Sequence, residues 1–490
     1  MPMRTVLIWS LITAMGALAS GAEPPAFDDF FVDRTLRIDY FQTGDADEVI
    51  VSIDQVYEQG IWAGNPDGLI DTLNRGMYYV RVVDINTNRT IYTRGFSNLF
   101  GEYRTTDDAR QGIKKTFHHS VLIPCPKRPF LFVLEGRDRT NLLAPIYKTR
   151  IDPADQNIIR QNRNPDDRVV TIWRNGDAHD KVDFLFVAEG YAAGQWKKFC
   201  GDVKRFAEVI FTVEPFKTHR SRFNVSGVFR PSAESGVDEP TRGSFKNTVL
   251  SASYNALDTP RYLLLDDNRA LRDIAQAVPY DYLIVLVNNP SYGGGGIYND
   301  YTIFTADDRR SEQILMHEFG HGFADLADEY IGGVAYNDFY PPGVEPCPPN
   351  ITALLDPNDV KWKHLLSPGI PVPTPWGQDE IEERREKIRA ARAEFAAQRE
   401  RLAQAGAGAG EIEDARARRD TAVETWEREI REIRERYESL YDGKIGVFEG
   451  AGYSAKGLYR SEMQIGMYRN GSYGPVSEEG IEDIIEHLSR

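Results

Sequence analysis

The feature that most constrains the fold is the pentapeptide HEFGH at residues 317–321. Residues four apart on an α-helix face the same side, so a helix here brings His317 and His321 together with Glu318 beside them. Two imidazoles at this spacing are typical ligands of one Zn²⁺, and the glutamate is placed to act as a general base. Apolar residues recur at helical spacing around the pentapeptide and predict one buried face. Ser311 is the expected N-terminal cap of this helix.

A catalytic zinc ion needs a third protein ligand and one open position. The acidic pair Asp328-Glu329 follows the pentapeptide and offers two candidates. A straight helix rises about 1.5 Å per residue, which would leave Asp328 roughly 10 Å beyond His321 along the axis. The helix is therefore expected to break or tighten first, with Gly322 as the predicted point. The alternative is that the two histidines and the acidic pair are ordinary surface residues of an amphipathic helix and its C-terminal end.

Composition and the N-terminus indicate a secreted globular protein. The chain has 490 residues, 41% of them hydrophobic, and a formal net charge of −16, which argues against a nucleic acid partner. Residues 1–22 predict a signal peptide, because a basic residue precedes an apolar run and small residues. That run is short of the roughly 20 residues that span a bilayer, so no stable membrane span is expected. The predicted location is secreted, periplasmic or cell-surface.

Two regions of the chain differ in patterning. Residues 23–154 contain alternating and β-branched runs between turn residues, which predict an all-β sandwich domain. The polar stretch 155–167 is the predicted linker. Residues 168–490 alternate buried-strand runs with helical periodicity, so an α/β catalytic domain is expected there. The predicted strands of that domain lie at residues 182–188, 223–229, 282–287 and 301–304.

A third region, residues 378–440, is dominated by Glu, Arg and Ala. Apolar residues recur in it at seven-residue or three-four spacing, which predicts two amphipathic helices. The AGAGAG run at 405–410 separates them, so an antiparallel helical hairpin inserted into the catalytic domain is expected. Its charges are interpreted as a solvated surface, with a docking arm for a substrate or partner as the alternative.

Cysteines and glycosylation sequons add little to this interpretation. The three cysteines lack the paired spacing of a zinc site and leave room for one disulfide. Sequons of the N-x-S/T type begin at Asn88, Asn224, Asn350 and Asn470.

Several longer motifs accompany the pentapeptide. They are HEFGHGFADLADEY at 317–330, VAEGY at 187–191, ESGVDEP at 234–240, FEGAGY at 448–453 and GLYRSEMQIGMYRNGSYGPVSEE at 457–479. In these motifs the chain resembles the igalysin, or IgA-peptidase, family of metzincin-like zinc metallopeptidases, over nearly the whole mature chain except the hairpin. The resemblance implies an α/β (α+β) metzincin-like domain after an all-β domain. It also implies Zn²⁺ as cofactor and a protein or peptide as substrate.

The resemblance also ranks the candidates for the third ligand. Ala327 stands where a metzincin places its third histidine, and an alanine cannot bind metal. Asp328 is the next residue and is the preferred ligand, with Glu329 as the alternate. Ala324 replaces the glycine that metzincins usually have three residues after the second histidine, so the route to the third ligand differs here.

Further roles follow from the same resemblance. Met467, with Met463 as second choice, matches the methionine that forms an apolar floor under the zinc. Tyr468 is a weaker candidate for stabilising the oxyanion. Residues 301–304 are the expected edge strand that pairs with the substrate backbone, and the glycine stretch 293–296 is the expected flexible lip beside it.

Two rival functions use the same residues. In the first, the protein is a secreted binding or adhesion protein with a structural zinc, but a structural zinc has no use for Glu318. In the second, the protein is a zinc amidase that acts on cell-wall peptide. The preferred function is a zinc-dependent endopeptidase with Glu318 as general base and His317, His321 and Asp328 as ligands.

Overall fold

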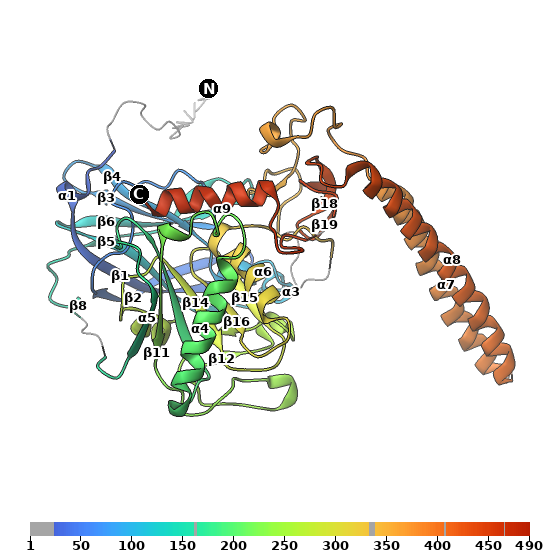
Figure 1. The fold of residues 1–490 in the computed structure, drawn as a ribbon, viewed down its shortest axis with the longest axis horizontal. Helices are drawn as coiled ribbons and strands as arrows, with labels where there is room; N and C mark the ends of the chain where they lie inside the picture. Colours follow the sequence, from blue (N-terminus) through green and yellow to red (C-terminus); the bar gives the residue numbers. More distant parts are fainter. Residues whose placement is uncertain (1–23, 161–163, 333–338, 406–407, 465) are drawn as a thin grey trace, which may run out of the picture.

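The computed structural model describes residues 24–160, 164–332, 339–405, 408–464 and 466–490. The predicted signal peptide, 1–22, and residues 161–163 of the predicted linker lie outside these ranges. The described chain is mixed α/β, with a β-rich N-terminal part (residues 24–160), a larger C-terminal part (residues 164–490) and a long helical hairpin that projects from it (Figure 1). No helix within the described ranges is long and apolar enough to cross a membrane.

Two four-stranded sheets form the N-terminal part, in the orders β5-β1-β2-β8 and β4-β3-β6-β7. Apolar side chains of both sheets, such as Ile38, Val82 and Phe132, share one buried core, as expected when each sheet hides one face. The strands and helices of this part are β1 (Phe31–Gly44), β2 (Val49–Glu58), β3 (Tyr78–Asp84), β4 (Arg89–Phe96), β5 (Lys115–Pro126), β6 (Phe130–Arg137), β7 (Leu143–Ile151), β8 (Ile159–Arg160), α1 (Phe27–Phe30), α2 (Leu99–Tyr103) and α3 (Asp107–Arg110).

A six-stranded sheet in the order β15-β16-β14-β10-β11-β9 organises the C-terminal part. Its four inner strands are parallel and both edge strands are antiparallel. Helices cover both faces, which explains the continuous apolar runs of the inner strands. The strands are β9 (Arg168–Trp173), β10 (Val182–Glu189), β11 (Phe223–Phe229), β14 (Tyr282–Val287), β15 (Gly294–Ile297) and β16 (Tyr301–Thr305).

Three helices pack on one face of this sheet and one short helix packs on the other. The first three are α4 (Trp196–Ile210), α6 (Ser311–Ala324) and α9 (Pro475–Leu488), and the fourth is α5 (Asn268–Ala275). Smaller sheets complete the C-terminal part. Their strands are β12 (Ala252–Ser253), β13 (Leu264–Leu265), β17 (Ile351–Thr352), β18 (Phe448–Ala451) and β19 (Ser454–Arg460).

The edge strand differs from the prediction. Residues 301–304 fall in β16, which lies inside the sheet, and the glycine stretch expected to be a lip forms the edge strand β15. A Cβ atom on Gly296 would lie 2.0 Å from the carbonyl oxygen of Glu318, and one on Gly294 would lie 3.0 Å from the Glu318 Cγ. Glycine is therefore needed because β15 passes directly against α6.

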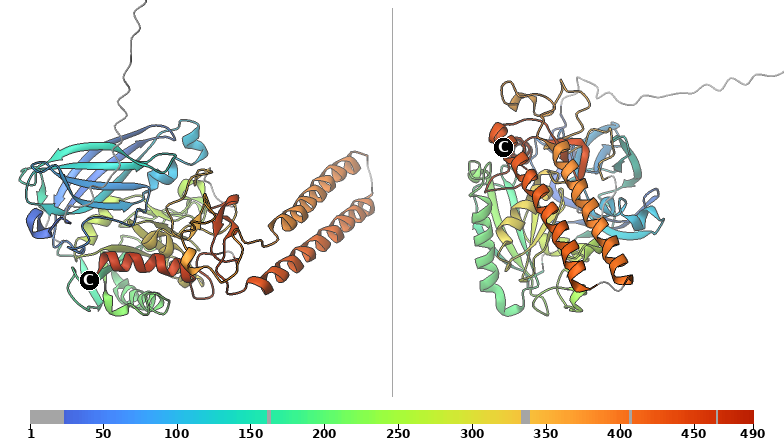
Figure 2. Two further views of the ribbon diagram at one scale, coloured as in Figure 1. Left: turned by 90° about the horizontal axis from the view of Figure 1, so that it is seen from above. Right: turned by 90° about the vertical axis from the view of Figure 1, so that its right-hand side faces the viewer.

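The hairpin consists of α7 (Gln378–Gln404) and α8 (Ala409–Tyr441), which run antiparallel and point away from the body of the protein (Figure 2). Apolar residues of both helices are buried between them, and at the base they pack with Trp376, Phe448 and Met463. Leu440 follows the three-four spacing that predicts the apolar face of the second helix, but it is 52% exposed. Tyr441 continues the spacing set by Tyr437 and packs in the cluster instead.

Candidate metal centre

The helix that carries the pentapeptide ends later than predicted. α6 spans Ser311–Ala324, and the chain leaves it at Asp325, which adopts a left-handed conformation with φ 56°. Aspartate tolerates this conformation better than most residues. Gly322 lies inside the helix, where a Cβ atom would be 1.9 Å from the hydroxyl of Tyr282, so it serves close packing and not a break. Ser311 is the first helical residue and not the cap; its hydroxyl donates to the Asp308 carbonyl at 2.7 Å.

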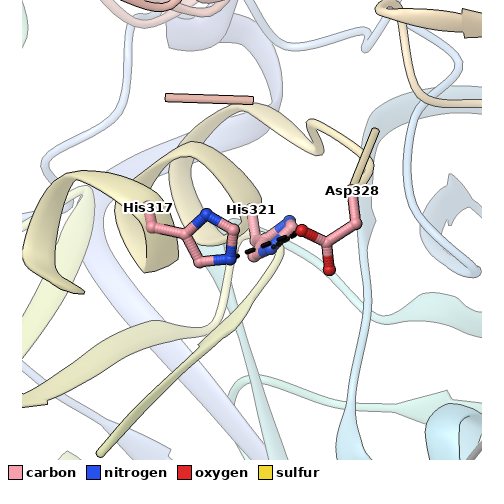
Figure 3. Close-up of side chains that lie close together, drawn as sticks. All are labelled: His317, His321 and Asp328. Atoms are coloured by element: carbon pink, nitrogen blue, oxygen red, sulfur yellow. Dashed lines mark ion pairs between the residues drawn. The ribbon is translucent and has the colours of Figure 1, made fainter. Parts of the chain in front are cut away.

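Beyond this turn the chain brings Asp328 back to the two histidines (Figure 3). The Asp328 Oδ1 atom lies 3.4 Å from the Nε2 atom of His317 and 3.5 Å from that of His321. Ligands about 2.1 Å from a tetrahedral ion lie about 3.4 Å from one another. The three side chains therefore have the spacing of zinc ligands.

Two further observations fit a bound cation. Asp328 Oδ1 is buried and has the two histidine Nε2 atoms 3.4 and 3.5 Å away, but no described residue reaches it with a regular hydrogen bond. A cation between these atoms would compensate the charge of the buried carboxylate. The Nδ1–H of His321 donates to the Leu326 carbonyl at 2.6 Å, so the Nε2 atom faces Asp328. Ligand histidines are commonly oriented by such a bond from the other ring nitrogen.

The protonation states follow from burial and from the charges in the cluster. Burial lowers the pKa of His317 to about 4, aided by His321. Burial opposes the charge on His321, but Asp328 outweighs it and raises the pKa of His321 to about 9. Burial also opposes ionisation of Asp328, yet the nearby His321 holds its pKa well below the usual range. Without a metal ion, Asp328 and His321 thus form an ion pair, and metal binding would release the imidazolium proton.

Glu318 lies beside the three side chains, at the wall of a cleft with a volume of about 420 Å³. Burial raises the pKa of its carboxyl to about 7, a value suited to a group that takes and returns a proton near neutral pH. Both parts of the chain line the cleft. The N-terminal part contributes Met77, Ser97 and Glu102, and the C-terminal part contributes aromatic and basic residues such as Arg261, Tyr330, Tyr453 and Tyr468.

Glu329, the alternate ligand, lies apart from the histidines. Its Oε1 atom accepts a hydrogen bond from Asn350 Nδ2 at 3.2 Å, and burial raises its pKa to about 7. The chain around it pairs with residues 452–453 in a strand-like manner, and in such a segment consecutive side chains point in opposite directions. Asp328 and not Glu329 therefore faces the cluster.

Residues distant in sequence hold this segment, and most of them carry no local pattern that predicts this role. Asn350 accepts from the Ala327 N–H and donates to the Ala327 carbonyl, both at 2.8 Å. It is fully buried, so its sequon is not accessible to a glycan in the folded protein. The hydroxyl of Tyr453 donates to Asp328 Oδ2 at 2.9 Å. Tyr453 lies in the family motif FEGAGY noted above, whereas Asn350 was noted only as the start of a sequon.

The two methionine candidates separate in the structure. Met467 is buried beneath α6, where a Cβ atom on Gly320 would lie 2.8 Å from its Cε atom. Met463 belongs to the cluster at the base of the hairpin. The first choice is thus the methionine under the histidine helix, and Tyr468 lines the cleft near it. The three cysteines are all free.

Comparison with known protein families gives two matches that together follow the described architecture. Residues 170–485 match the family model described as IgA Peptidase M64, and residues 26–148 match the one described as Peptidase M64 N-terminus. A search of curated proteins gives no match. The first match spans most of the chain and includes the pentapeptide, the acidic pair and the helical hairpin.

Proposed function

The chain belongs to the IgA Peptidase M64 family and is a peptidase acting on protein substrates, and from this premise we propose that it is a secreted zinc-dependent endopeptidase. The observation that carries the zinc assignment is the position of Asp328 Oδ1, at 3.4 and 3.5 Å from the Nε2 atoms of His317 and His321. We assign residues 168–490 to a metzincin-like catalytic domain and residues 23–154 to a β-sandwich domain. Residues 1–22 are assigned to the signal peptide.

When held by these three side chains, Zn²⁺ would lower the pKa of a water ligand from about 15.7 towards about 7 and polarise the scissile carbonyl. Glu318 accepts the proton of the attacking water and passes it to the leaving amine. Burial favours this cycle, because it raises the pKa of the Glu318 carboxyl above its usual value and so helps the carboxyl to hold the proton before passing it on. The Leu326 carbonyl keeps His321 in the required tautomer.

The edge strand β15 is the proposed docking site for the substrate backbone. The Gly294 carbonyl already accepts from the Leu263 N–H at 3.3 Å. Gly296 lies two residues further on, faces the same edge and lines the cleft. Its backbone N–H and carbonyl are therefore the groups that would pair with an extended peptide.

Replacement of Glu318 by glutamine tests the mechanism. The amide keeps the size of the side chain but cannot act as a base, so Glu318→Gln should retain zinc and lose hydrolysis of peptides. Zinc content by elemental analysis and cleavage of a broad peptide library are the two measurements. A zinc-loaded variant that cleaves peptides at nearly the wild-type rate would contradict the assignment. Cleavage of cell-wall peptide but of no library peptide would favour the amidase.

A further inference from the structure

The turn that redirects the chain from α6 to Asp328 contacts the N-terminal part. This turn is centred on Asp325, whose left-handed backbone ends the helix. Its Oδ2 atom accepts a hydrogen bond from the backbone N–H of Gly76 at 3.0 Å. Gly76 lies in the segment before β3, 249 residues earlier in the chain. A group of the N-terminal part therefore holds the residue that sets the path to the third ligand.

Gly76 is itself held firmly. Arg137 on β6 donates to the Gly76 carbonyl at 2.7 Å and to the carbonyls of Asn74 and Asn141, each at 3.0 Å. Gly76 has φ +84°, and a Cβ atom there would lie 2.6 Å from the Phe96 carbonyl oxygen, so this position requires glycine. The N–H that Asp325 accepts is thus part of a segment with little freedom to move.

The neighbouring residue attaches the same segment to the C-terminal part. Arg75 donates to the Gly480 carbonyl at 2.6 Å and forms an ion pair with Asp483 at 2.6 Å, both on α9. One of its nitrogens also lies 3.5 Å from the carbonyl of Ala324, the last residue of α6. The segment 75–76 therefore touches α6 at its end and the helix beside it.

The position of this turn affects metal binding, because the ligand atoms of a metal site must lie at defined distances from one another. Asp328 follows the turn after only two intervening residues, so a shift of the turn moves its carboxylate relative to the two imidazoles. Asn350 and Tyr453 hold the far side of this segment from within the C-terminal part. The Gly76 N–H holds the near side, and it comes from the β-sandwich.

We propose that the N-terminal part is a positioning element of the metal centre, acting through the bond from the Gly76 N–H to Asp325. The proposal rests on the proposed zinc site. Asp325 and Gly76 are positioning residues, since neither belongs to the candidate ligand group of His317, His321 and Asp328. The β-sandwich then contributes to zinc affinity as well as to one wall of the cleft.

Substitutions of Asp325 in the full-length protein separate this bond from the backbone conformation. Asp325→Gly keeps the left-handed conformation at no steric cost but loses the acceptor. Asp325→Asn keeps both the conformation and an acceptor oxygen. The zinc dissociation constant, measured by competition with a chelator, should rise 10–100-fold for the glycine variant and stay within about threefold of wild type for the asparagine variant.

Two more variants complete the test. The first is a control, and the second disturbs the Gly76 segment from the N-terminal part. Asn268→Ala removes contacts to His118 and Ser120 elsewhere between the two parts, so it should lower Tm and leave the zinc dissociation constant unchanged. Arg137→Met frees the Gly76 segment without altering α6 and should weaken zinc binding in the same direction as Asp325→Gly. This variant decides the question if Asp325→Gly does not fold.

Each outcome bears on one claim. A wild-type protein that binds no zinc would refute the proposed function itself. If the wild type binds zinc and neither Asp325→Gly nor Arg137→Met changes the dissociation constant, the positioning role is refuted. Equal losses in Asp325→Gly and Asp325→Asn would also refute it, because the bond would then not be the cause. Weakened binding in the glycine variant with rescue by asparagine supports it.

Discussion

Replacement of Gly296 by alanine should impair the proposed metal centre although it changes none of the proposed ligand side chains. In the structure, the added Cβ atom would lie 2.0 Å from the carbonyl oxygen of Glu318 and 2.9 Å from its carbonyl carbon. Both atoms belong to the backbone of α6, so no side-chain rotation relieves the overlap. Contacts below 3.0 Å are essentially never seen for a Cβ atom, and α6 or β15 must therefore move by about 1 Å.

The size of the effect follows from what α6 carries. His317, Glu318 and His321 move with the helix, whereas Asp328 is held separately by Tyr453 and the Asn350 contact. A misplacement of about 1 Å in an active site can cost about 10²-fold in rate, or about 2.7 kcal/mol in the barrier. Overpacking of this kind also destabilises a fold by about 1–3 kcal/mol.

The assay is kcat/KM on a fluorogenic peptide together with zinc content and Tm. We expect Gly296→Ala to lose about 10²-fold in kcat/KM while remaining folded. Gly194→Ala is the control, because a Cβ atom there meets nothing within 4 Å, and it should behave as wild type. If Gly296→Ala keeps full zinc and a kcat/KM within threefold of wild type, the close contact between β15 and α6 does not position the metal centre.

Two further predictions concern the third ligand and the hairpin. Asp328→Ala should reduce zinc occupancy far more than Glu329→Ala, because the Glu329 carboxylate faces Asn350; metal analysis showing the reverse ranking would assign the ligand to Glu329. Replacement of residues 393–422 by a short Gly/Ser turn should leave hydrolysis of small peptides intact, because it spares the base packed on Trp376 and Phe448. Removal of the whole hairpin, residues 378–440, should also leave this hydrolysis intact, but it should lower Tm because it exposes the apolar residues at the base. Loss of zinc in the shorter deletion would show that the distal hairpin supports the catalytic part.

Local periodicity allowed much of the fold to be predicted from the sequence. The strands at 223–229 and 282–287 were predicted with the bounds that the structure has for β11 and β14. Both are buried on two faces, so nearly all their residues are apolar or small, and such a run is visible without tertiary information. The exception in β11 is Asn224, whose amide donates to Asp183 and to the Gly176 carbonyl. Helical spacing placed the two histidines on one face of α6 for the same kind of reason.

Contacts between segments distant in sequence determined two features that local periodicity does not predict, the edge strand and the end of the buried face of the hairpin. The glycine stretch 293–296 carries no sign that a helix lies against it, so its role as an edge strand emerged only from the packing of β15 on α6. The apolar face of α8 ends on Tyr441 and not on Leu440, because Phe448 lies at the base of α8 and packs against Tyr441.

The sequence by itself determined that His317 and His321 share one helical face with Glu318 beside them, because helix geometry depends only on residues within one turn. The choice between Asp328 and Glu329 was different. It depended on the left-handed turn at Asp325, which Gly76 holds, and on Asn350 and Tyr453, which hold the segment that follows. Those residues lie far from the pentapeptide in sequence, so only the tertiary structure decided which carboxylate faces the histidines.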